Sequence, residues 1–253
     1  MYSSTRFSQV LNLIPQSNFS RSVSEVNADK YAKKIKCTDV LKVMIYGQLS
    51  QAKSLRNLVE GSNSHMNKLN IPRSTLSEAL VKRSFTPFQD LSELLLKQER
   101  RKVQKECKSY LMLIDSTPIP LDLKTFTWAK ARAGRSHNGL KLHTMIHSKD
   151  SVPLYANITP ANVNDLSDAR AHIDIEKGST YVMDKGYYDY NWWYKINEIG
   201  AYFVTRIKRN ARYKVVKNYP VHDSSIRYDQ LIHLTNKRPR AKAVNFYANK
   251  DLR

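Results

Sequence analysis

The chain of 253 residues has only two cysteines, Cys37 and Cys107, and it lacks long apolar runs. The two cysteines lie far apart and neither has a C-x-x-C partner, so the sequence indicates neither a disulfide framework nor a zinc site. No stretch reaches the roughly 18 consecutive apolar residues of a membrane-spanning helix, and the N-terminus has no apolar core of the signal-peptide kind. These absences favour a cytoplasmic protein in a reducing compartment.

Acidic residues are also scarce, because 22 Asp and Glu stand against 42 Lys and Arg and give a formal net charge of +20. The excess lies in two flanks: residues 1–105 and 199–253 each carry +10, whereas residues 106–198 are neutral. Basic flanks attract polyanions, of which nucleic acid is the commonest. A generally basic, solvated surface is the alternative. No basic amphipathic stretch indicates an anionic membrane surface, so we expect double-stranded DNA as the partner and no membrane.

Residues 1–105 predict a small all-helical domain. Apolar residues recur at three- and four-residue intervals in "SQVLNLIP", "CTDVLKVMIYGQLSQA" and "SLRNLVEG". The segment "IPRSTLSEALVKRS" has Ser74 as a candidate N-cap and Glu78 behind it, an arrangement that resembles the second helix of a helix-turn-helix. Helical hairpins without any DNA contact have the same pattern. The candidate DNA contacts in this domain are Arg73, Lys82 and Arg83.

From residue 109 onward the periodicity changes from helical to alternating. Three strand-like runs, "SYLMLIDSTPIPL", "LKLHTMIHS" and "SVPLYANITP", are followed by a helical segment, the strand "TYVMDKGY", a second helical segment and the strand "AYFVTRIK". Successive strands followed by strand–helix alternation predict an α/β fold, a mixed sheet with flanking helices. We place this core at residues 106–212 and an incomplete C-terminal region at residues 213–253.

Two of the predicted strands end in an aspartate, "LMLID" at Asp115 and "YVMD" at Asp184. Functional groups gather at the carboxyl ends of strands in open α/β sheets, and adjacent strands would bring the two carboxylates within metal-bridging distance. Their mutual repulsion is then relieved by protonation of one or by divalent cations. The alternatives are a strand-end cap on the "DSTP" turn for Asp115 and a turn aspartate for Asp184.

Several other side chains have a structural and a functional interpretation. His143 is interpreted as a buried strand histidine, with metal ligation as the alternative, and Asp165 as the N-cap of the following helix. Trp192 and Trp193 are interpreted as packing residues, with base stacking as the alternative. A basic cluster after the last strand either contacts phosphates or is merely solvated. Its members are Arg206, Lys208, Arg209 and Arg212.

Four blocks resemble the DDE transposases of bacterial insertion sequences: "LMLIDSTPIPL", "GLKLHTMIHSKDSVPLYANITPANVNDLSDA", "YVMDKGYYDY" and "AYFVTRIKRNARY". The most similar branch is the insertion sequence type four family, whose D-x-G-Y motif is matched by Asp184 to Tyr187. The resemblance implies a ribonuclease-H-like fold in which Asp115 lies on the first strand and Asp184 follows the fourth. It further implies that both bind two Mg²⁺ or Mn²⁺ ions for cleavage and transfer of DNA at transposon ends.

The family's third acid is a glutamate in the pattern Y-xx-R-xxx-E-xxxxxx-K, and no glutamate follows Glu198 in this chain. Glu198 precedes the fifth predicted strand, and Asp223, Asp229 and Asp251 do not fit the pattern. We therefore expect a C-terminally truncated, impaired transposase, associated with the nucleoid through DNA, and leave open whether it is an enzyme alone or forms a homodimer. The alternatives are a non-catalytic DNA-binding remnant that regulates transposition and a metal-dependent nuclease of ribonuclease-H-like fold.

Overall fold

The computed structural model describes residues 6–65, 70–106, 110–122, 138–235 and 250–252. The chain forms two compact units, Met1–Leu95 and Leu96–Arg253, and each is described by itself. One helix, α6 (Thr86–Glu106), runs from the first unit into the second. No helix in the described ranges has both the length and the apolar character needed to span a membrane.

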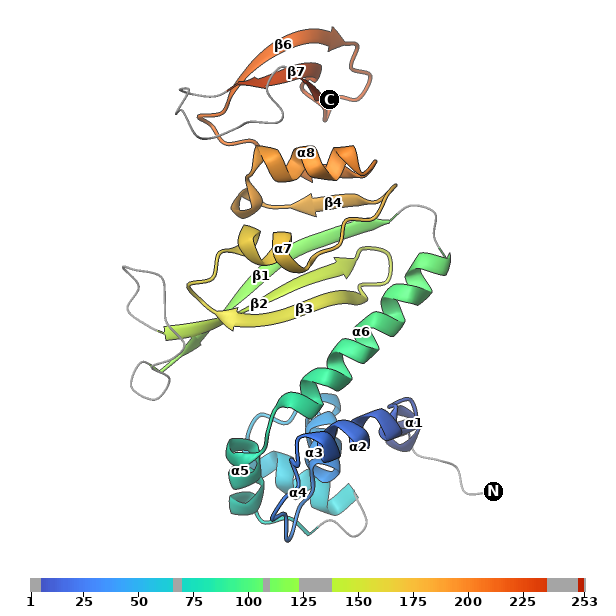
Figure 1. The fold of residues 1–253 in the computed structure, drawn as a ribbon, viewed down its shortest axis with the longest axis vertical. Coiled ribbons are helices and arrows are strands. Elements are labelled where there is room, and N and C mark those ends of the chain that lie inside the picture. Colours follow the sequence, from blue (N-terminus) through green and yellow to red (C-terminus); the bar gives the residue numbers. More distant parts are fainter. Residues whose placement is uncertain (1–5, 66–69, 107–109, 123–137, 236–249, 253) are drawn as a thin grey trace. The chain divides into compact units, whose positions relative to one another are not determined.

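The first unit is helical, as its periodicity predicts (Figure 1). Its helices before α6 are α1 (Arg6–Asn12), α2 (Gln16–Glu25), α3 (Cys37–Leu49), α4 (Leu55–His65) and α5 (Arg73–Lys82). Their apolar stripes meet in two clusters, one around Val43 and Leu76 and one around Phe19 and Cys37. The prediction that Ser74 caps α5 is wrong, because Pro72 is the N-cap and Ser74 lies in the first turn.

The second unit is built on a five-stranded sheet of order β3-β2-β1-β4-β5. Its strands are β1 (Leu111–Leu121), β2 (Asn138–His147), β3 (Pro153–Pro160), β4 (Thr180–Met183) and β5 (Tyr202–Thr205). β2 pairs antiparallel with β1 and β3, whereas β4 pairs parallel with β1 and β5. Helix α7 (Asp165–His172) precedes β4 and α8 (Tyr190–Glu198) follows it. The predicted α/β, ribonuclease-H-like class with a helical N-terminal region is confirmed.

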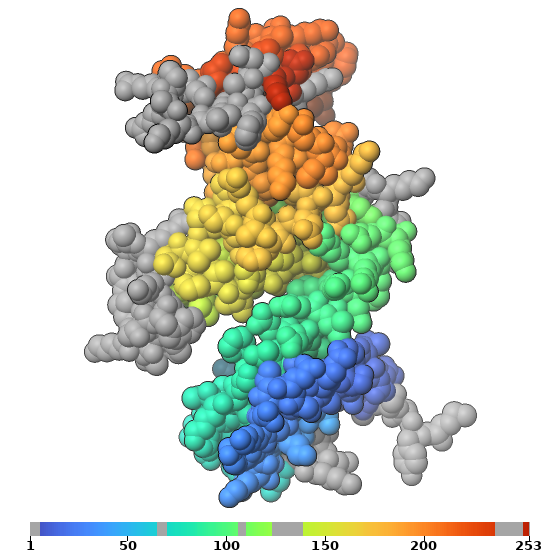
Figure 2. Space-filling view, in the orientation of Figure 1, coloured from blue at the N-terminus to red at the C-terminus, as the bar shows by residue number. Residues whose placement is uncertain are grey.

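The two faces of this sheet differ in how they are packed. Met112, Ile114, Tyr181 and Met183 belong to the hydrophobic core, together with residues of α7 and α8. In Figure 2 the segments from β3 to α8 form the yellow-to-orange part of the surface. The alternate residues form the opposite, open face. Exposed apolar side chains on it are Leu111, Leu113, Tyr202 and Val204.

A three-stranded antiparallel sheet follows β5, with the order β6-β7-β8. It consists of β6 (Arg212–Tyr219), β7 (Asp229–Thr235) and β8 (Asp251–Leu252). The short strand predicted from "YKVVK" is part of β6. Leu234 of β7 is fully buried and joins the core of the second unit, so this sheet packs on the larger one rather than forming a core of its own.

Candidate active site

Asp115 and Asp184 lie side by side in the sheet. The last aligned pair of β1 and β4 is Ile114 with Met183, and the aspartates are the residues that follow, Asp115 within β1 and Asp184 directly after β4. Neighbouring strands are about 5 Å apart, so the backbones of Ile114 and Met183 pass each other at about this distance. Side-chain alternation in β1 places Asp115 on the open face, and both aspartates are exposed. The structure therefore brings the two predicted site residues together.

Each aspartate is fixed by its local backbone. Asp115 Oδ1 accepts a hydrogen bond from the Ser116 amide at 2.8 Å, and Asp184 Oδ1 accepts one from the Gly186 amide at 2.6 Å. Asp184 is thereby also the N-cap of the 3-10 turn η1 (Lys185–Tyr187). A Cβ on Gly186 would lie 2.8 Å from Asp184 Oδ1, closer than real Cβ contacts come. Glycine is thus needed for the carboxylate to take this position.

Tyr187 shows how much negative charge gathers at this end of the sheet. Its side chain is 2 % exposed. Burial raises the pKa of the Tyr187 phenol, and the charges of Asp165, Asp115, Asp184 and Asp168 raise it further. The negative charges of four carboxylates therefore all raise the pKa of the Tyr187 hydroxyl. A cation bound near these carboxylates would be electrostatically favoured.

The carboxylate pair has the donor chemistry of a divalent-metal site. Carboxylate oxygens are the hard ligands that Mg²⁺ and Mn²⁺ prefer, and a cation would offset the repulsion between two ionised groups at strand spacing. Among the described residues, however, no group of three His, Cys, Asp or Glu side chains is arranged to hold a metal ion. Asp115 and Asp184 thus fit a hard divalent cation as two ligands, without a third from the described ranges.

Asp165 does not cap helix α7 as predicted. The cap is Asn164, whose side chain accepts a hydrogen bond from the Leu166 amide. Asp165 Oδ1 instead accepts hydrogen bonds from Lys141 Nζ at 2.7 Å and from Ser116 Oγ at 2.8 Å. Burial alone would raise the pKa of Asp165, but these two hydrogen bonds and the lysine charge lower it. The carboxylate is therefore ionised at neutral pH.

His143 is buried on the covered face, at 2 % exposure, as its position in the strand predicts. Its Nε2 lies 2.9 Å from Thr159 Oγ1, and its Nδ1 lies 3.7 Å from both Asp165 Oδ1 and Asp168 Oδ2. Burial lowers the pKa of this imidazole, although the two carboxylates oppose the shift.

Trp192 and Trp193 are both buried core residues, as predicted for packing. Trp193 Nε1 donates to the Tyr187 carbonyl at 3.2 Å, and its ring stacks on Phe203 with the centroids 5.1 Å apart. Trp193 therefore holds the turn after Asp184, and neither indole can stack on a base without leaving the core.

Sequence reasoning missed Lys141 and Ser116 as parts of the site. Lys141 alternates with His143 and Met145 along β2, so a lysine at an inward-facing position was visible in "LKLHTM". A buried lysine is rare unless it is paired. A lysine at an inward-facing strand position was therefore the signal in the sequence that could have revealed the ion pair.

The predicted DNA-contacting residues differ in exposure, and Lys82 Nζ, although exposed, also pairs with Glu78 Oε1 at 2.6 Å. Arg206, Lys208, Arg209 and Arg212 are exposed after β5, and Arg73 and Lys82 are exposed on α5. Arg83 differs, because its guanidinium donates to the Ala28 carbonyl at 3.0 Å and pairs with Asp29 at 3.1 Å, with only 13 % of its side chain exposed. These contacts tie the end of α5 to the segment between α2 and α3, and the DNA contact of Arg83 stays a prediction.

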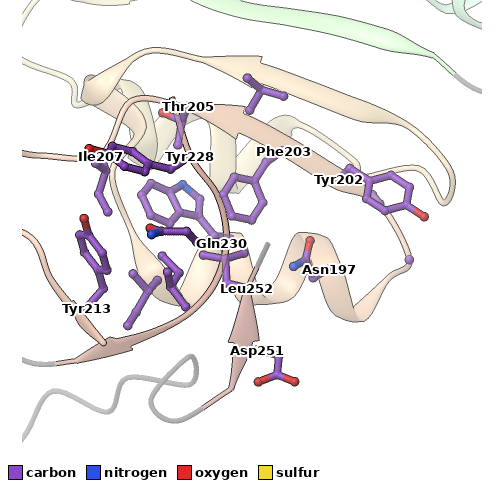
Figure 3. A pocket seen from close by; sticks show the side chains of 16 residues that line it. Asn197, Tyr202, Phe203, Thr205, Ile207, Tyr213, Tyr228, Gln230, Asp251 and Leu252 are labelled. Carbon is purple, nitrogen blue, oxygen red and sulfur yellow. The ribbon is translucent and has the colours of Figure 1, made fainter. Parts of the chain in front are cut away.

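A cavity of about 830 Å³ lies along β5, between α8 and the three-stranded sheet. Figure 3 shows Phe203, Tyr213 and Tyr228 around it, with Thr205 at one end. Thr205 Oγ1 donates to the Asp184 carbonyl at 3.3 Å, so the cavity adjoins the backbone of the carboxylate site. Neither Asp115 nor Asp184 lines it. The candidate active site is therefore the pair of carboxylates and not this cavity.

Comparison with known proteins agrees with this fold. A family model described as "Transposase DDE domain" matches residues 106–250. A second model, "Domain of unknown function (DUF4372)", matches residues 2–71. The chain therefore belongs to the DDE transposase family of insertion sequences.

One curated relative is named "Putative transposase y4zB", from Sinorhizobium fredii (strain NBRC 101917 / NGR234). It is 44% identical over 142 residues, which are 56% of this chain and 39% of the relative. The matched segment thus spans well under half of that protein.

Proposed function

We propose that the chain binds double-stranded DNA at transposon ends and supplies Asp115 and Asp184 to metal-dependent strand cleavage and strand transfer. The observation that carries this proposal is the pairing of Ile114 with Met183, which makes the two aspartates neighbours. Membership of the DDE transposase family supports the reaction class. The D-x-G-Y motif at Asp184 to Tyr187 favours the insertion sequence type four branch.

Mg²⁺ or Mn²⁺ is the cofactor that these ligands fit. When bound, the ion supplies activation of a water or DNA 3′-hydroxyl and stabilisation of the leaving oxygen. Asp115 and Asp184 would hold it, and both residues are exposed, so a DNA backbone can reach them. Gly186 keeps a side chain out of the space beside Asp184.

Exposed basic residues supply the DNA contacts in this proposal. Arg206, Lys208 and Arg209 directly follow Thr205, whose hydroxyl is bonded to the Asp184 carbonyl. Arg206 is thus the residue after Thr205, and the positive charges that begin there can hold DNA phosphates close to the carboxylates. Arg212 at the start of β6, and Arg73 and Lys82 on α5, add further exposed charge.

A second function, a non-catalytic DNA-binding regulator of transposition, is favoured by one observation. The described residues provide two acids but no three-ligand group, and a site with fewer ligands holds its ions less well. We infer that catalysis by this chain is weak unless a further carboxylate joins Asp115 and Asp184.

A strand-transfer assay separates these functions. The substrate is a labelled duplex carrying the ends of the insertion sequence, with Mg²⁺ or Mn²⁺, and the variants are Asp184→Ala and the control Asp150→Ala. Asp150 is also an exposed aspartate, but it pairs with His147 in the turn after β2. Joining that needs metal and is lost only in Asp184→Ala supports the transposase. Cleavage without joining indicates a nuclease, and salt-sensitive binding with neither indicates the regulator.

A further inference from the structure

A largely buried ion pair, Lys141 with Asp165, lies next to the carboxylate pair. Lys141 is 7 % exposed, and its Nζ donates to Asp165 Oδ1 and to the Val163 carbonyl, both at 2.7 Å. Burying a lysine and an aspartate costs several kcal/mol per ion, a penalty that their attraction often fails to offset. Such a pair therefore contributes little to stability, and its position next to the site points to another role.

Asp165 lies close to both chain segments that carry the site aspartates. Its Oδ1 accepts the Ser116 hydroxyl at 2.8 Å, and Ser116 is the residue after Asp115. Its Oδ2 lies 3.5 Å from the place where a Cβ on Gly186 would be, and Gly186 is the residue whose amide binds Asp184. One carboxylate on α7 is thus hydrogen-bonded to the β1 segment and lies beside the turn after β4.

We propose that Asp165, held in place by Lys141, is a positioning residue that sets the separation of Asp115 and Asp184 for their metal ion. This inference rests on the proposed function, because it takes the two aspartates as the metal ligands. β1 and β4 stop pairing at Ile114 and Met183, so the ladder itself does not fix the residues beyond. Beyond the ladder, Asp165 holds the β1 segment by a hydrogen bond and lies beside the turn after β4.

The contacts of Asp165 favour positioning over direct ligation. Its Oδ1 already accepts two hydrogen bonds, one of them from an ammonium group. A second cation bound to the same carboxylate would be repelled by that ammonium at short range. Removing Lys141 therefore has opposite effects in the two roles. A positioning Asp165 loses its anchor and metal binding weakens, whereas a ligating Asp165 loses a competing charge and metal binding tightens.

Mn²⁺ titration of the full chain, followed by the electron paramagnetic resonance signal of the free ion, tests this inference without an activity assay. We expect Asp184→Asn to abolish the site. Asp165→Asn and Lys141→Met should each weaken binding about 10- to 100-fold, the usual cost of losing a group that orients metal ligands. The control Lys149→Met removes an exposed lysine just beyond β2 and should leave the affinity unchanged.

The outcomes separate the inference from the function beneath it. If the wild type fails to bind Mn²⁺, or Asp184→Asn binds it equally well, the proposed metal site fails and this inference with it. If Asp184→Asn loses binding while Asp165→Asn keeps it, only the positioning role is overturned. Tighter binding by Lys141→Met also overturns it and makes Asp165 a ligand.

A conservative variant covers the case in which Lys141→Met does not fold. Ser116→Ala removes only the hydrogen bond to Asp165 and leaves the ion pair intact. An unchanged melting temperature with about 5-fold weaker Mn²⁺ binding, the worth of one ordinary hydrogen bond, supports the positioning role. An unchanged affinity in a folded Ser116→Ala overturns it.

Discussion

The two faces of the five-stranded sheet are formed by alternate residues of the same strands but have different functions. On β1, Met112 and Ile114 are buried under the helices at 1 % and 4 % exposure, whereas Leu111 and Leu113 between them are 44 % and 40 % exposed. The covered face holds most of the apolar contacts that stabilise the unit. The open face holds Asp115, and the exposed Asp184 directly follows β4; both need access to a large ligand. Because side chains alternate, one strand can contribute both to the core and to an exposed binding surface.

Polar groups show the same division. On the covered face Lys141, His143 and Asp168 are buried, and Tyr155 and Asn157 donate to Asp168 at 2.7 and 2.6 Å. The exposed Asp115 and Asp184 accept hydrogen bonds from their own local backbone. Buried polar groups must be satisfied within the protein, whereas exposed ones remain available to a ligand.

A matched pair of alanine substitutions gives the largest expected contrast between the faces. Ile114→Ala should lower the free energy of unfolding by about 2–5 kcal/mol, because it opens a cavity in the core. Leu113→Ala, one residue earlier on the open face, should lower it by about 1 kcal/mol or less, since its side chain is already partly in water. Urea denaturation measures both. Equal losses would show that the open face is packed in solution.

Tyr155→Phe tests the covered polar network and its pH dependence. Loss of the hydrogen bond to Asp168 should cost about 1–3 kcal/mol at pH 7. Burial, followed by the Asp168 hydrogen bond and charge, raises the pKa of Tyr155 above its ordinary value of 10.0. Its contribution is therefore complete below pH 10 and is lost as the pH rises through the folded pKa.

Unfolding curves at several alkaline pH values check this sign. Above pH 10, the free energy of unfolding should fall more steeply in the wild type than in Tyr155→Phe. Parallel curves would show that Tyr155 titrates alike in the folded and unfolded chain.

Threonine substitutions at Tyr202 and Val204 should have the smallest effect on stability. Both side chains are exposed on β5, at 63 % and 54 %, and threonine keeps a strand-favouring shape. We expect a change within about 0.5 kcal/mol in the free energy of unfolding for each substitution. Binding of the dye ANS should fall, because apolar surface is removed from the open face. Unchanged dye fluorescence would show that this face is not the dye-binding surface.

Local patterns in the sequence predict the order of elements and the meeting of Asp115 with Asp184, because both follow from periodicity and from strand adjacency. The length of β1 is not predicted. Its prediction ended at Asp115, yet the strand runs on to Leu121 through Pro118 and Pro120. Beyond Ile114 the strand pairs with β2 alone, and prolines are tolerated where one side of a strand has no partner.

The sequence does not predict which side chains meet through long-range contacts. Arg83 carries the same local signal as Lys82, but three carbonyl and carboxylate acceptors far along the chain engage its guanidinium. Asp165 sits where an N-cap is expected, and only the fold shows that Lys141 and Ser116 reach it. Charge and position along the sequence do not reveal which partner a side chain meets.

Iron-directed cleavage of the backbone tests the central claim, that Asp115 and Asp184 hold one divalent ion between them. Fe²⁺ with ascorbate and peroxide generates hydroxyl radicals where the metal binds. We predict cuts next to Asp115 and next to Asp184, which excess Mg²⁺ suppresses and Asp184→Asn abolishes. Cuts confined to other segments, or cuts at these two places that persist in Asp184→Asn, would contradict the claim.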